Sequence, residues 1–415
     1  MTQSSVAVRI FNGFAALVAL SVLAVLLLFV SLWIEHRVRL TLPVPTGPFA
    51  VGRSIVDWVD DATVDSLAPG PGTKRELLVW MWYPAAATLS GAKMDDYVPS
   101  QLRAKEDGGS APQPSKLFAL LTRDVAKIHG HVVNNAVLLP GQPSYPVVIM
   151  RTGASQPVVN YSTLAEDLAS HGYVVVGFDA PYRTQRVVFP DGRVMTRTPE
   201  NNPEFCESLA QARQDSCMKR LLSAWTADIG FTLDRLAKLN ADQASPFSAR
   251  LDLSRVGVFG HSLGGATAAQ FCHDDSRCTA GIDLDGQPFG SVVHEGMKQP
   301  FMFVVSDQVH GTDPETRQIL ANIQSIYDHL PPDGRFRVTI RGANHFFFSD
   351  DAALLKSHIV IRMLRLLGVV RIEGRRQLAV TAWCVRTFFD AYLKGADGSR
   401  LNILSPRYPE IEAFQ

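Results

Sequence analysis

A single serine stands between closely spaced glycines in the stretch GHSLG, residues 260–264. It follows the apolar run 256–259, and Gly265 and small helix-forming residues come next. This is the G-x-S-x-G pattern of a tight strand-to-helix turn, in which larger side chains would clash. Such a turn would hold the Ser262 hydroxyl above the strand ends, where it can act as the nucleophile in acyl transfer.

A serine hydroxyl needs a histidine base, and the base needs a carboxylate that fixes its tautomer. In this architecture the chain order is serine, acid, histidine. We expect His345 to be the base, because the segment RGANHFFFSD follows the strand predicted at 335–341. The other histidines after Ser262 fall in predicted helices or earlier loops: His273, His294, His310, His329 and His358.

Two aspartates compete for the role of the acid. Asp285 ends the strand predicted at 279–285, and Asp307 ends the one at 301–307. Both would lie at the carboxyl edge of the sheet, where active sites gather. The common position after the later strand favours Asp307, although spacing leaves both open. Asp283 is expected to support the site by hydrogen bonding, and Asp179, which precedes the serine, to be structural.

Backbone N–H groups are the expected donors to the oxyanion. One is that of Leu263, at the start of the helix after the serine. The second should come from the loop RTGASQP, residues 151–157, where we favour Ala154. This chemistry requires neither a metal nor an organic cofactor.

Strands and helices alternate in the region that must position these groups. Continuous apolar strands separated by helices predict a mostly parallel sheet with helices on both faces, an α/β fold. The remaining predicted strands are 76–85, 145–150 and 173–179, and the clearest helices are 160–172 and 221–239. An insertion at 181–219, with a hairpin at 187–195, is a candidate lid. Residues 36–75 are interpreted as a linker and entry segment, and 117–128 as a short helix. The apolar stretches 352–370 and 382–393 are expected to be packing helices, with a lipid-contacting surface as the alternative.

Residues 10–34 contain no charged side chain. A helix of that length would reach about 37 Å, enough to span a bilayer with tilt. We therefore predict a tail at 1–9, a transmembrane anchor at 10–34, a linker at 35–45 and one folded domain at 46–415. A cleaved signal peptide and a buried core helix are the alternatives.

Charge and cysteines give opposite indications of membrane orientation. Arg37, Arg39 and Arg53 after the span, against Arg9 before it, would keep the domain in the cytoplasm. Two close cysteine pairs, Cys206 with Cys217 and Cys272 with Cys278, instead suggest disulfides and an oxidising compartment. Cys384 is left over, reduced cysteines are the alternative, and zinc is disfavoured because the usual spacings are missing. We favour an extracytoplasmic domain in a single-pass membrane protein.

Composition excludes some classes of protein. Among 415 residues, 46% are hydrophobic and 19% charged, which fits a buried core and argues against disorder. The net charge is zero and no basic stripe occurs, so nucleic acid is not an expected partner. Oligomeric state is left open.

Seven segments, in the same order, resemble the platelet-activating factor acetylhydrolase family, which comprises the plasma and intracellular type-II forms and bacterial relatives. They are TGPFAVG (46–52), WYPA (82–85), YPVVIM (145–150), LASHGYVVVGFD (168–179), GHSLGGAT (260–267), AGIDLDGQPFG (280–290) and NHFFFSD (344–350). The resemblance implies an α/β-hydrolase fold. It also implies calcium-independent hydrolysis of short acyl esters, including the sn-2 acetyl of ether phospholipids. It assigns the nucleophile to Ser262, the base to His345 and the acid to Asp285 rather than Asp307.

One segment departs from the family pattern. After the strand 145–150 the family usually carries His-Gly, whereas this chain has Arg151 and Thr152 in a loop that is one residue longer. Because this loop should supply an oxyanion donor, substrate range is left open. A general carboxylesterase or polyester-type hydrolase is the alternative enzyme, and a hydrolase scaffold that binds without turnover is the alternative of another class.

Overall fold

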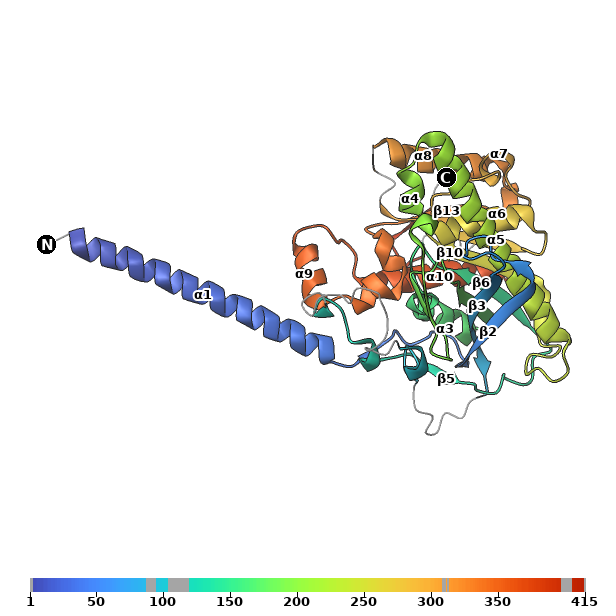
Figure 1. The fold of residues 1–415 in the computed structure, drawn as a ribbon, viewed down its shortest axis with the longest axis horizontal. Coiled ribbons are helices and arrows are strands. Elements are labelled where there is room, and N and C mark those ends of the chain that lie inside the picture. Colours follow the sequence, from blue (N-terminus) through green and yellow to red (C-terminus); the bar gives the residue numbers. More distant parts are fainter. Residues whose placement is uncertain are drawn as a thin grey trace.

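A ten-stranded sheet forms the centre of the computed structural model, which describes residues 3–86, 95–103, 119–307, 311, 313–396 and 405–413. The strand order is β14-β13-β12-β11-β10-β6-β7-β3-β2-β5 (Figure 1). Six neighbouring strands run parallel. They are β6 (Tyr145–Arg151), β7 (Val174–Asp179), β10 (Leu251–His261), β11 (Ala280–Leu284), β12 (Phe301–Val305) and β13 (Arg335–Ile340). The sheet is mostly parallel, as predicted.

The outer strands make the sheet mixed. β3 (Lys74–Ala85) pairs antiparallel with both β7 and β2 (Ala50–Val64), and β14 (Ile411–Ala413) pairs antiparallel with β13. Short β5 (Val132–Asn134) completes the far edge beside β2. Two small pairs lie outside this sheet, β1 (Leu40–Thr41) with β4 (Ile128–His129) and β8 (Arg186–Val188) with β9 (Val194–Thr196).

Helices cover both faces of the sheet because both faces are apolar. In β6, Val148 and Met150 belong to one hydrophobic core, whereas Val147 and Ile149 belong to the other. The first core is closed by α3 (Ser162–Ser170) and α10 (Gly374–Lys394). The second is closed by α5 (Gln211–Ala241), α6 (Leu263–Asp274) and α8 (Pro314–His329). Alternation along fully buried strands thus explains the predicted layers.

Three local predictions differ from the structure. Residues 36–75 are not only a linker, because they include the 15-residue strand β2. Hydrogen bonds to β3 hold β2 in the sheet although several of its residues are polar and exposed. The short helix expected at 117–128 lies partly outside the described residues. In its described part Ala119 is helical, and a 3-10 turn, Val125–Lys127, and the start of β4 follow, so the helix does not extend to residue 128. The helix predicted at 221–239 begins at Gln211, inside the expected insertion. The hairpin expected at 187–195 is present as β8 and β9.

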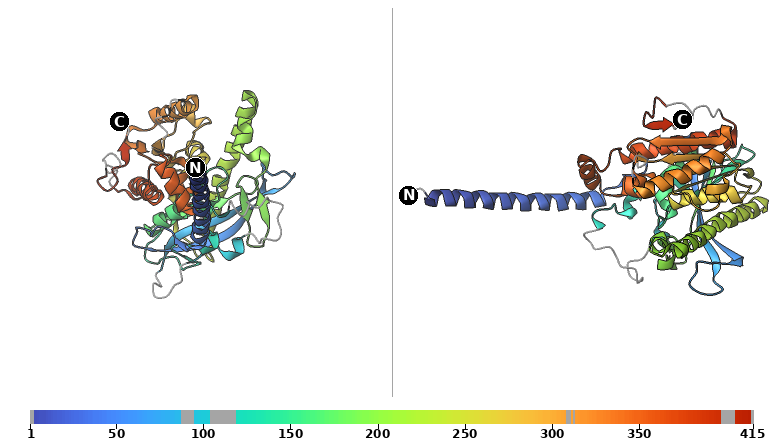
Figure 2. Two further views of the ribbon diagram at one scale, coloured as in Figure 1. Left: turned by 90° about the vertical axis from the view of Figure 1, so that its left-hand side faces the viewer. Right: turned by 90° about the horizontal axis from the view of Figure 1, so that it is seen from above.

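α1 (Gln3–Arg37) projects away from the body of the molecule (Figures 1 and 2). Its segment Phe11–Arg37 is long and apolar enough to cross a membrane by length and composition, and most of it is exposed. Near the end of α1 lies α9 (His358–Leu366). The stretch 382–393 is a packing helix, as predicted, because α10 is largely buried. No residue of α9 is buried, so the prediction of a packing helix within 352–370 is wrong over α9.

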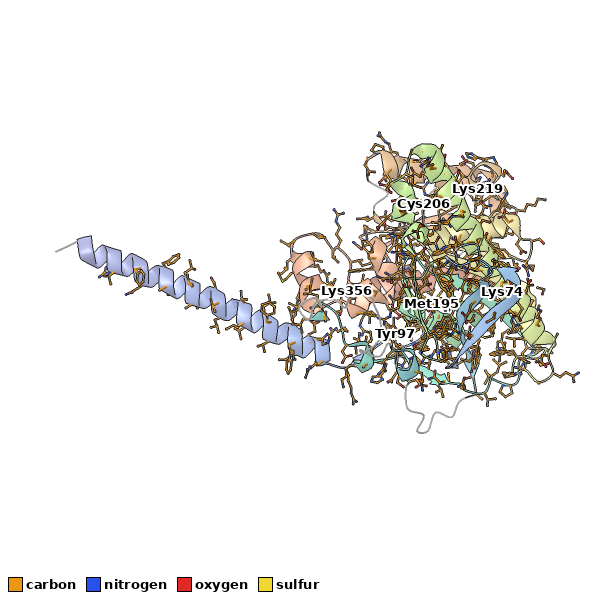
Figure 3. The ribbon with its side chains drawn as sticks, viewed as in Figure 1. Lys74, Tyr97, Met195, Cys206, Lys219 and Lys356 are labelled. Atoms are coloured by element: carbon orange, nitrogen blue, oxygen red, sulfur yellow. A yellow bond between two sulfur atoms is a disulfide. The ribbon has the colours of Figure 1, made fainter. Side chains whose placement is uncertain are left out.

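Both expected cysteine pairs form disulfides. Cys206 joins α4 (Pro203–Glu207) to Cys217 in α5 (Figure 3), and Cys272 at the end of α6 joins Cys278 before β11. Cys384 is buried in α10 as a free thiol. Each bridge closes a short loop, one of them within the predicted insertion.

Candidate active site

Ser262 occupies the turn between β10 and α6. Its φ of 56° and ψ of −124° are a strained backbone conformation for a non-glycine residue. The neighbouring glycines make the turn possible, because a Cβ at Gly260 would collide with the backbone of Gly264. A Cβ at Gly264 would collide with the carbonyls of Arg151 and Thr152. The serine turn is therefore packed directly against the loop that follows β6.

His345 and Asp285 lie in contact at the carboxyl edge of the sheet. His345 Nδ1 is 2.7 Å from Asp285 Oδ2. Asp285 follows β11 with a φ of 54°, and its Oδ1 accepts a hydrogen bond of 2.6 Å from the Ser306 backbone N–H. One carboxylate oxygen is thus held by the backbone while the other faces the imidazole. Such an arrangement fixes the tautomer and orientation of a histidine base.

The structure does not bring Asp307 to His345. Arg371 Nη1 donates to Asp307 Oδ2 at 2.9 Å, and the Asp307 backbone N–H donates to the Ala343 carbonyl at 3.3 Å. Asp307, which the usual position of the acid after the later strand favoured, is therefore engaged in an ion pair with Arg371. Asp285, the residue that the resemblance indicated, is the carboxylate in contact with the imidazole.

The two other aspartates considered at this edge make structural hydrogen bonds. Asp283 Oδ1 accepts from the Gly286 N–H at 2.7 Å, and burial raises the pKa of Asp283 well above its usual range. It therefore supports the loop that carries Asp285. Asp179 Oδ1 accepts from the Val158 N–H at 2.8 Å, and burial raises its pKa to about 7.

Backbone donors are available on both sides of the serine. Leu263 is the first residue of α6, and Ala154 lies in the loop after β6. Within the described part of the chain, neither backbone N–H donates to a backbone carbonyl. The Gly153 N–H differs, because it donates to Tyr161 Oη at 3.1 Å. Ala154 is therefore a better candidate donor than Gly153 in this loop.

Sequence reasoning missed a buried pair behind the serine. Tyr161 Oη and His261 Nδ1 are 2.7 Å apart, and the His261 ring centroid lies 4.6 Å from that of His345. Burial, with a further effect of the charge of His345, holds the pKa of His261 well below its usual value. A neutral His261 ring can pack beside His345 without opposing positive charge on it. Because Tyr161 and His261 are 100 residues apart, no local pattern indicates their contact.

Arg151 points into the core rather than standing as a free cation. Its guanidinium carbon lies 4.0 Å from the Trp225 ring centroid and 4.6 Å from that of Phe178. Asp228 Oδ2 is 3.7 Å from Arg151 Nη2, and burial lowers the pKa of Arg151 to about 10. Trp225 and Asp228 belong to α5, so Arg151 joins the end of β6 to that helix.

A small apolar cluster connects the insertion to the serine turn. It contains Leu263 and the insertion residue Cys206, and Ala154, Met218 and Phe289 pack against it. From Met218 and Phe289 a cavity of about 1180 Å³ extends between α5 and α8. None of Ser262, Asp285 and His345 lines this cavity, and most of its exposed surface is apolar. Many of its lining residues are nevertheless polar or acidic, including Gln211, Gln214, Asp215, Gln287, Glu315 and Gln318. The insertion therefore packs against Leu263, beside the serine turn, and its role as a lid stays a prediction.

Within the described ranges, no group of three or more histidine, cysteine, aspartate or glutamate residues is placed to hold a metal ion.

The parallel sheet, the serine turn after β10 and the carboxylate–histidine contact at the same edge define an α/β-hydrolase. A similar solved structure is a ferulic acid esterase from Streptomyces cinnamoneus. The TM-score is 0.69 at 25% sequence identity, over 90% of this chain and 99% of that chain.

Sequence comparison identifies the family within that class. The profile described as platelet-activating factor acetylhydrolase, isoform II, matches residues 35–394, so the chain belongs to this family. A platelet-activating factor acetylhydrolase of Cavia porcellus is 29% identical over 252 residues, 58% of this chain and 56% of that protein. The chain thus spans little more than half of that relative. A probable 1-alkyl-2-acetylglycerophosphocholine esterase of Arthroderma benhamiae is 24% identical over 399 residues, 89% of this chain and 92% of that protein.

Proposed function

We propose that this protein is a serine esterase that hydrolyses short-chain carboxylic esters, including the sn-2 acetyl ester of ether phospholipids. The observation that carries the proposal is the 2.7 Å contact between His345 and Asp285 at the sheet edge that also bears the strained Ser262 turn. The family to which the chain belongs and the esterase names of its relatives support the substrate class.

In the proposed reaction, Ser262 Oγ attacks the ester carbonyl while His345 Nε2 accepts the hydroxyl proton. The Leu263 and Ala154 N–H groups stabilise the negative oxygen of the tetrahedral intermediate. His345 then returns the proton to the departing alcohol and leaves an acyl group on Ser262. Water, activated by the same histidine, releases the acid and restores the serine.

Asp285 acts on this cycle through His345. It keeps the Nδ1 proton in place, so that Nε2 faces the serine, and it stabilises the imidazolium that forms twice per turnover. The Ser306 N–H keeps Asp285 from rotating away. The proposed mechanism uses no metal and no organic cofactor.

We also propose that residues 10–34 anchor the enzyme in a membrane, with the catalytic domain on the extracytoplasmic side. The apolar segment of α1 supports the anchor, and the two disulfides support an oxidising compartment. Alkaline carbonate extraction of membranes tests the anchor, and protease accessibility in intact cells tests the side. A soluble protein in which residues 1–34 have been removed would instead show a cleaved signal peptide.

A general carboxylesterase is the second candidate. The cavity beside Phe289 combines polar side chains with a larger apolar surface, which suits a bulky ester, and one solved structure of similar fold is a ferulic acid esterase. Such an enzyme would use the same serine, base and acid on a bulkier leaving group.

A substrate panel separates these candidates. Acetyl and longer-chain p-nitrophenyl esters, methyl ferulate and a 2-acetyl ether phospholipid would be assayed beside Ser262→Ala. We expect the short ester and the phospholipid to be hydrolysed, and both activities to be lost in Ser262→Ala. Hydrolysis of simple esters without the phospholipid would indicate a general carboxylesterase. A folded protein that hydrolyses none of them would indicate a binding protein.

A further inference from the structure

Arg151 ends strand β6 directly beside the serine turn. In the pairing of β6 with β10 it stands opposite Gly260, the first glycine of the G-x-S-x-G motif. Its carbonyl and that of Thr152 lie where a side chain at Gly264 would have to go. The backbone of Arg151 is therefore fixed against the serine turn, and the loop that carries Ala154 starts from this fixed point.

The side chain of Arg151 leaves this point on the face of the sheet that α5 covers. Residues alternate between the two faces along β6, and Val147 and Ile149, on the same side, belong to the core closed by α5. The guanidinium lies between two aromatic rings, with its carbon 4.0 Å from the Trp225 centroid and 4.6 Å from that of Phe178. Because Trp225 belongs to α5 and Phe178 to β7, the arginine joins three elements.

This guanidinium has little polar compensation. Arg151 is 1% exposed, and none of its three side-chain nitrogens has a hydrogen-bond partner among the described residues. Asp228 Oδ2 is 3.7 Å from Nη2, so it balances the charge from beyond hydrogen-bond distance. Asp228 is also shared with Arg183, which donates to its two oxygens at 2.8 and 2.6 Å. Since a buried cation without hydrogen bonds is costly, stability alone does not account for an arginine at this place.

Trp225 connects the arginine to both candidate oxyanion donors. It is 3% exposed and belongs to the same apolar cluster as Leu263, and Ala154 packs against that cluster. The cluster therefore holds the indole under the guanidinium together with the two residues whose N–H groups are the candidate donors. A shift of this ring would move both sides of the oxyanion site.

We propose that Arg151 is a positioning residue of the oxyanion hole, clamped between Phe178 and Trp225 so that the Ala154 and Leu263 N–H groups point at the same oxygen. This inference rests on the proposed esterase function. Arg151 acts through the backbone of its loop and through the ring of Trp225, and not on the substrate. A planar guanidinium can stack on both rings at once, which neither a lysine ammonium nor an aliphatic chain can do.

The test separates transition-state binding from substrate binding. Arg151→Met removes the planar cation and keeps most of the side-chain volume. We expect kcat for p-nitrophenyl acetate to fall about 10²-fold, as for the loss of one oxyanion donor, with KM nearly unchanged. The inhibition constant of a trifluoromethyl ketone, which forms a tetrahedral oxyanion adduct with the serine, should rise by a similar factor. Partial unfolding would reduce the amount of active enzyme and leave this inhibition constant unchanged.

A second buried arginine provides the matched control. Arg75 Nε lies 3.3 Å from Asp228, the carboxylate nearest to Arg151, but Arg75 belongs to β3 and not to the loop after β6. Arg75→Met should lower the urea midpoint of unfolding and leave kcat and the inhibition constant nearly unchanged. This control distinguishes an effect on the loop from a general effect of disturbing the buried charges.

Two milder variants keep the test decisive if Arg151→Met does not fold. Arg151→Lys keeps the charge without the planar stack and should recover little of kcat. Trp225→Phe keeps a smaller ring under the guanidinium and should raise the same inhibition constant, by less than Arg151→Met. Combining Trp225→Phe with Arg151→Met should add little to the loss, because residues that act as one unit are not additive.

Each contrary result is distinct. A wild-type protein that hydrolyses no ester and whose Ser262 is not labelled by a fluorophosphonate overturns the proposed function itself. With an active wild type, an unchanged inhibition constant in Arg151→Met or in Trp225→Phe overturns the clamp. An equal rise in Arg75→Met overturns it as well, because the effect would then belong to the buried charges. Full activity in Arg151→Lys would show that stacking does not position the loop.

Discussion

His345 Nδ1 lies 2.7 Å from Asp285 Oδ2, whereas Asp307, one strand further along, is paired with Arg371. The two aspartates follow neighbouring strands and differ in their side-chain partners, an imidazole for Asp285 and a guanidinium for Asp307. We predict that Asp285→Asn lowers kcat for p-nitrophenyl acetate by about 10⁴-fold, because the amide favours the wrong tautomer of His345.

Asp307→Asn is the matched control, since it removes a surface ion pair worth about 0–1 kcal/mol and should leave kcat nearly unchanged. Steady-state kinetics on both variants, with folding checked by circular dichroism, decides the point. A larger loss in Asp307→Asn than in Asp285→Asn would reassign the acid.

Tyr161 links the loop after β6, residues 151–157, to His261, because its hydroxyl contacts both the Gly153 N–H and His261 Nδ1. Tyr161→Phe leaves these two buried polar groups unpaired, which should destabilise the fold by about 1–3 kcal/mol. It should also lower kcat, since the loop that carries Ala154 loses its support.

Urea unfolding measures the first effect, and p-nitrophenyl acetate kinetics the second. Tyr83→Phe is a suitable control, because the Tyr83 hydroxyl bonds a carbonyl remote from the serine turn, that of Ala136. If kcat were unchanged in Tyr161→Phe, the loop would not depend on this hydroxyl.

Glu166 makes stability depend on pH. Burial raises the pKa of Glu166 to about 8, although the His131 N–H donates to one of its oxygens. The folded state therefore binds a proton that the unfolded state loses above about pH 4.5. The stabilisation is fully present below that pH and is lost as pH rises through about 8.

Glu166→Gln should match the wild type near about pH 4 and exceed it near about pH 8, by on the order of a few kcal/mol. Thermal melts across this range test the prediction, with Glu207→Gln, on the exposed surface of α4, as control. Parallel pH profiles for wild type and Glu166→Gln would refute the assignment.

The Cys206–Cys217 bridge holds the insertion against the serine turn, since Cys206 belongs to the apolar cluster that includes Leu263. Replacing both cysteines by serine should cost about 2–4 kcal/mol and lower kcat/KM for bulky esters more than for p-nitrophenyl acetate. The double replacement at Cys272 and Cys278 is the control, because that bridge lies at the far end of α6. Equal effects of the two replacements on substrate preference would argue against a lid.

Much of the central fold could be predicted from the sequence because the buried strands are continuous apolar runs. YPVVIM and the strand before Ser262 need no tertiary context to be recognised, and the G-x-S-x-G spacing follows from backbone sterics alone. β2 was missed because its polar, partly exposed residues are held by pairing with β3 rather than by an apolar pattern.

Contacts between distant residues account for what remained hidden. Strand position and spacing do not distinguish Asp285 from Asp307. The family resemblance favours Asp285, and the tertiary partners of the two aspartates agree with it. From the sequence, Arg151 is expected to be a charged residue in the loop that supplies an oxyanion donor. In the structure it is buried against Trp225 and Asp228, more than 70 residues later in the chain. Glu35 is likewise expected from the sequence to be an exposed residue at the end of the span, whereas in the structure it accepts a hydrogen bond from Ser357.

Covalent labelling of the serine tests the central claim most directly. The full-length protein would be treated with a fluorophosphonate probe and the modified peptide identified by mass spectrometry. We predict stoichiometric labelling of Ser262, loss of esterase activity in proportion, and no labelling in Ser262→Ala. A folded, unlabelled Ser262, or activity that persists after Ser262 is fully modified, would contradict the proposed mechanism.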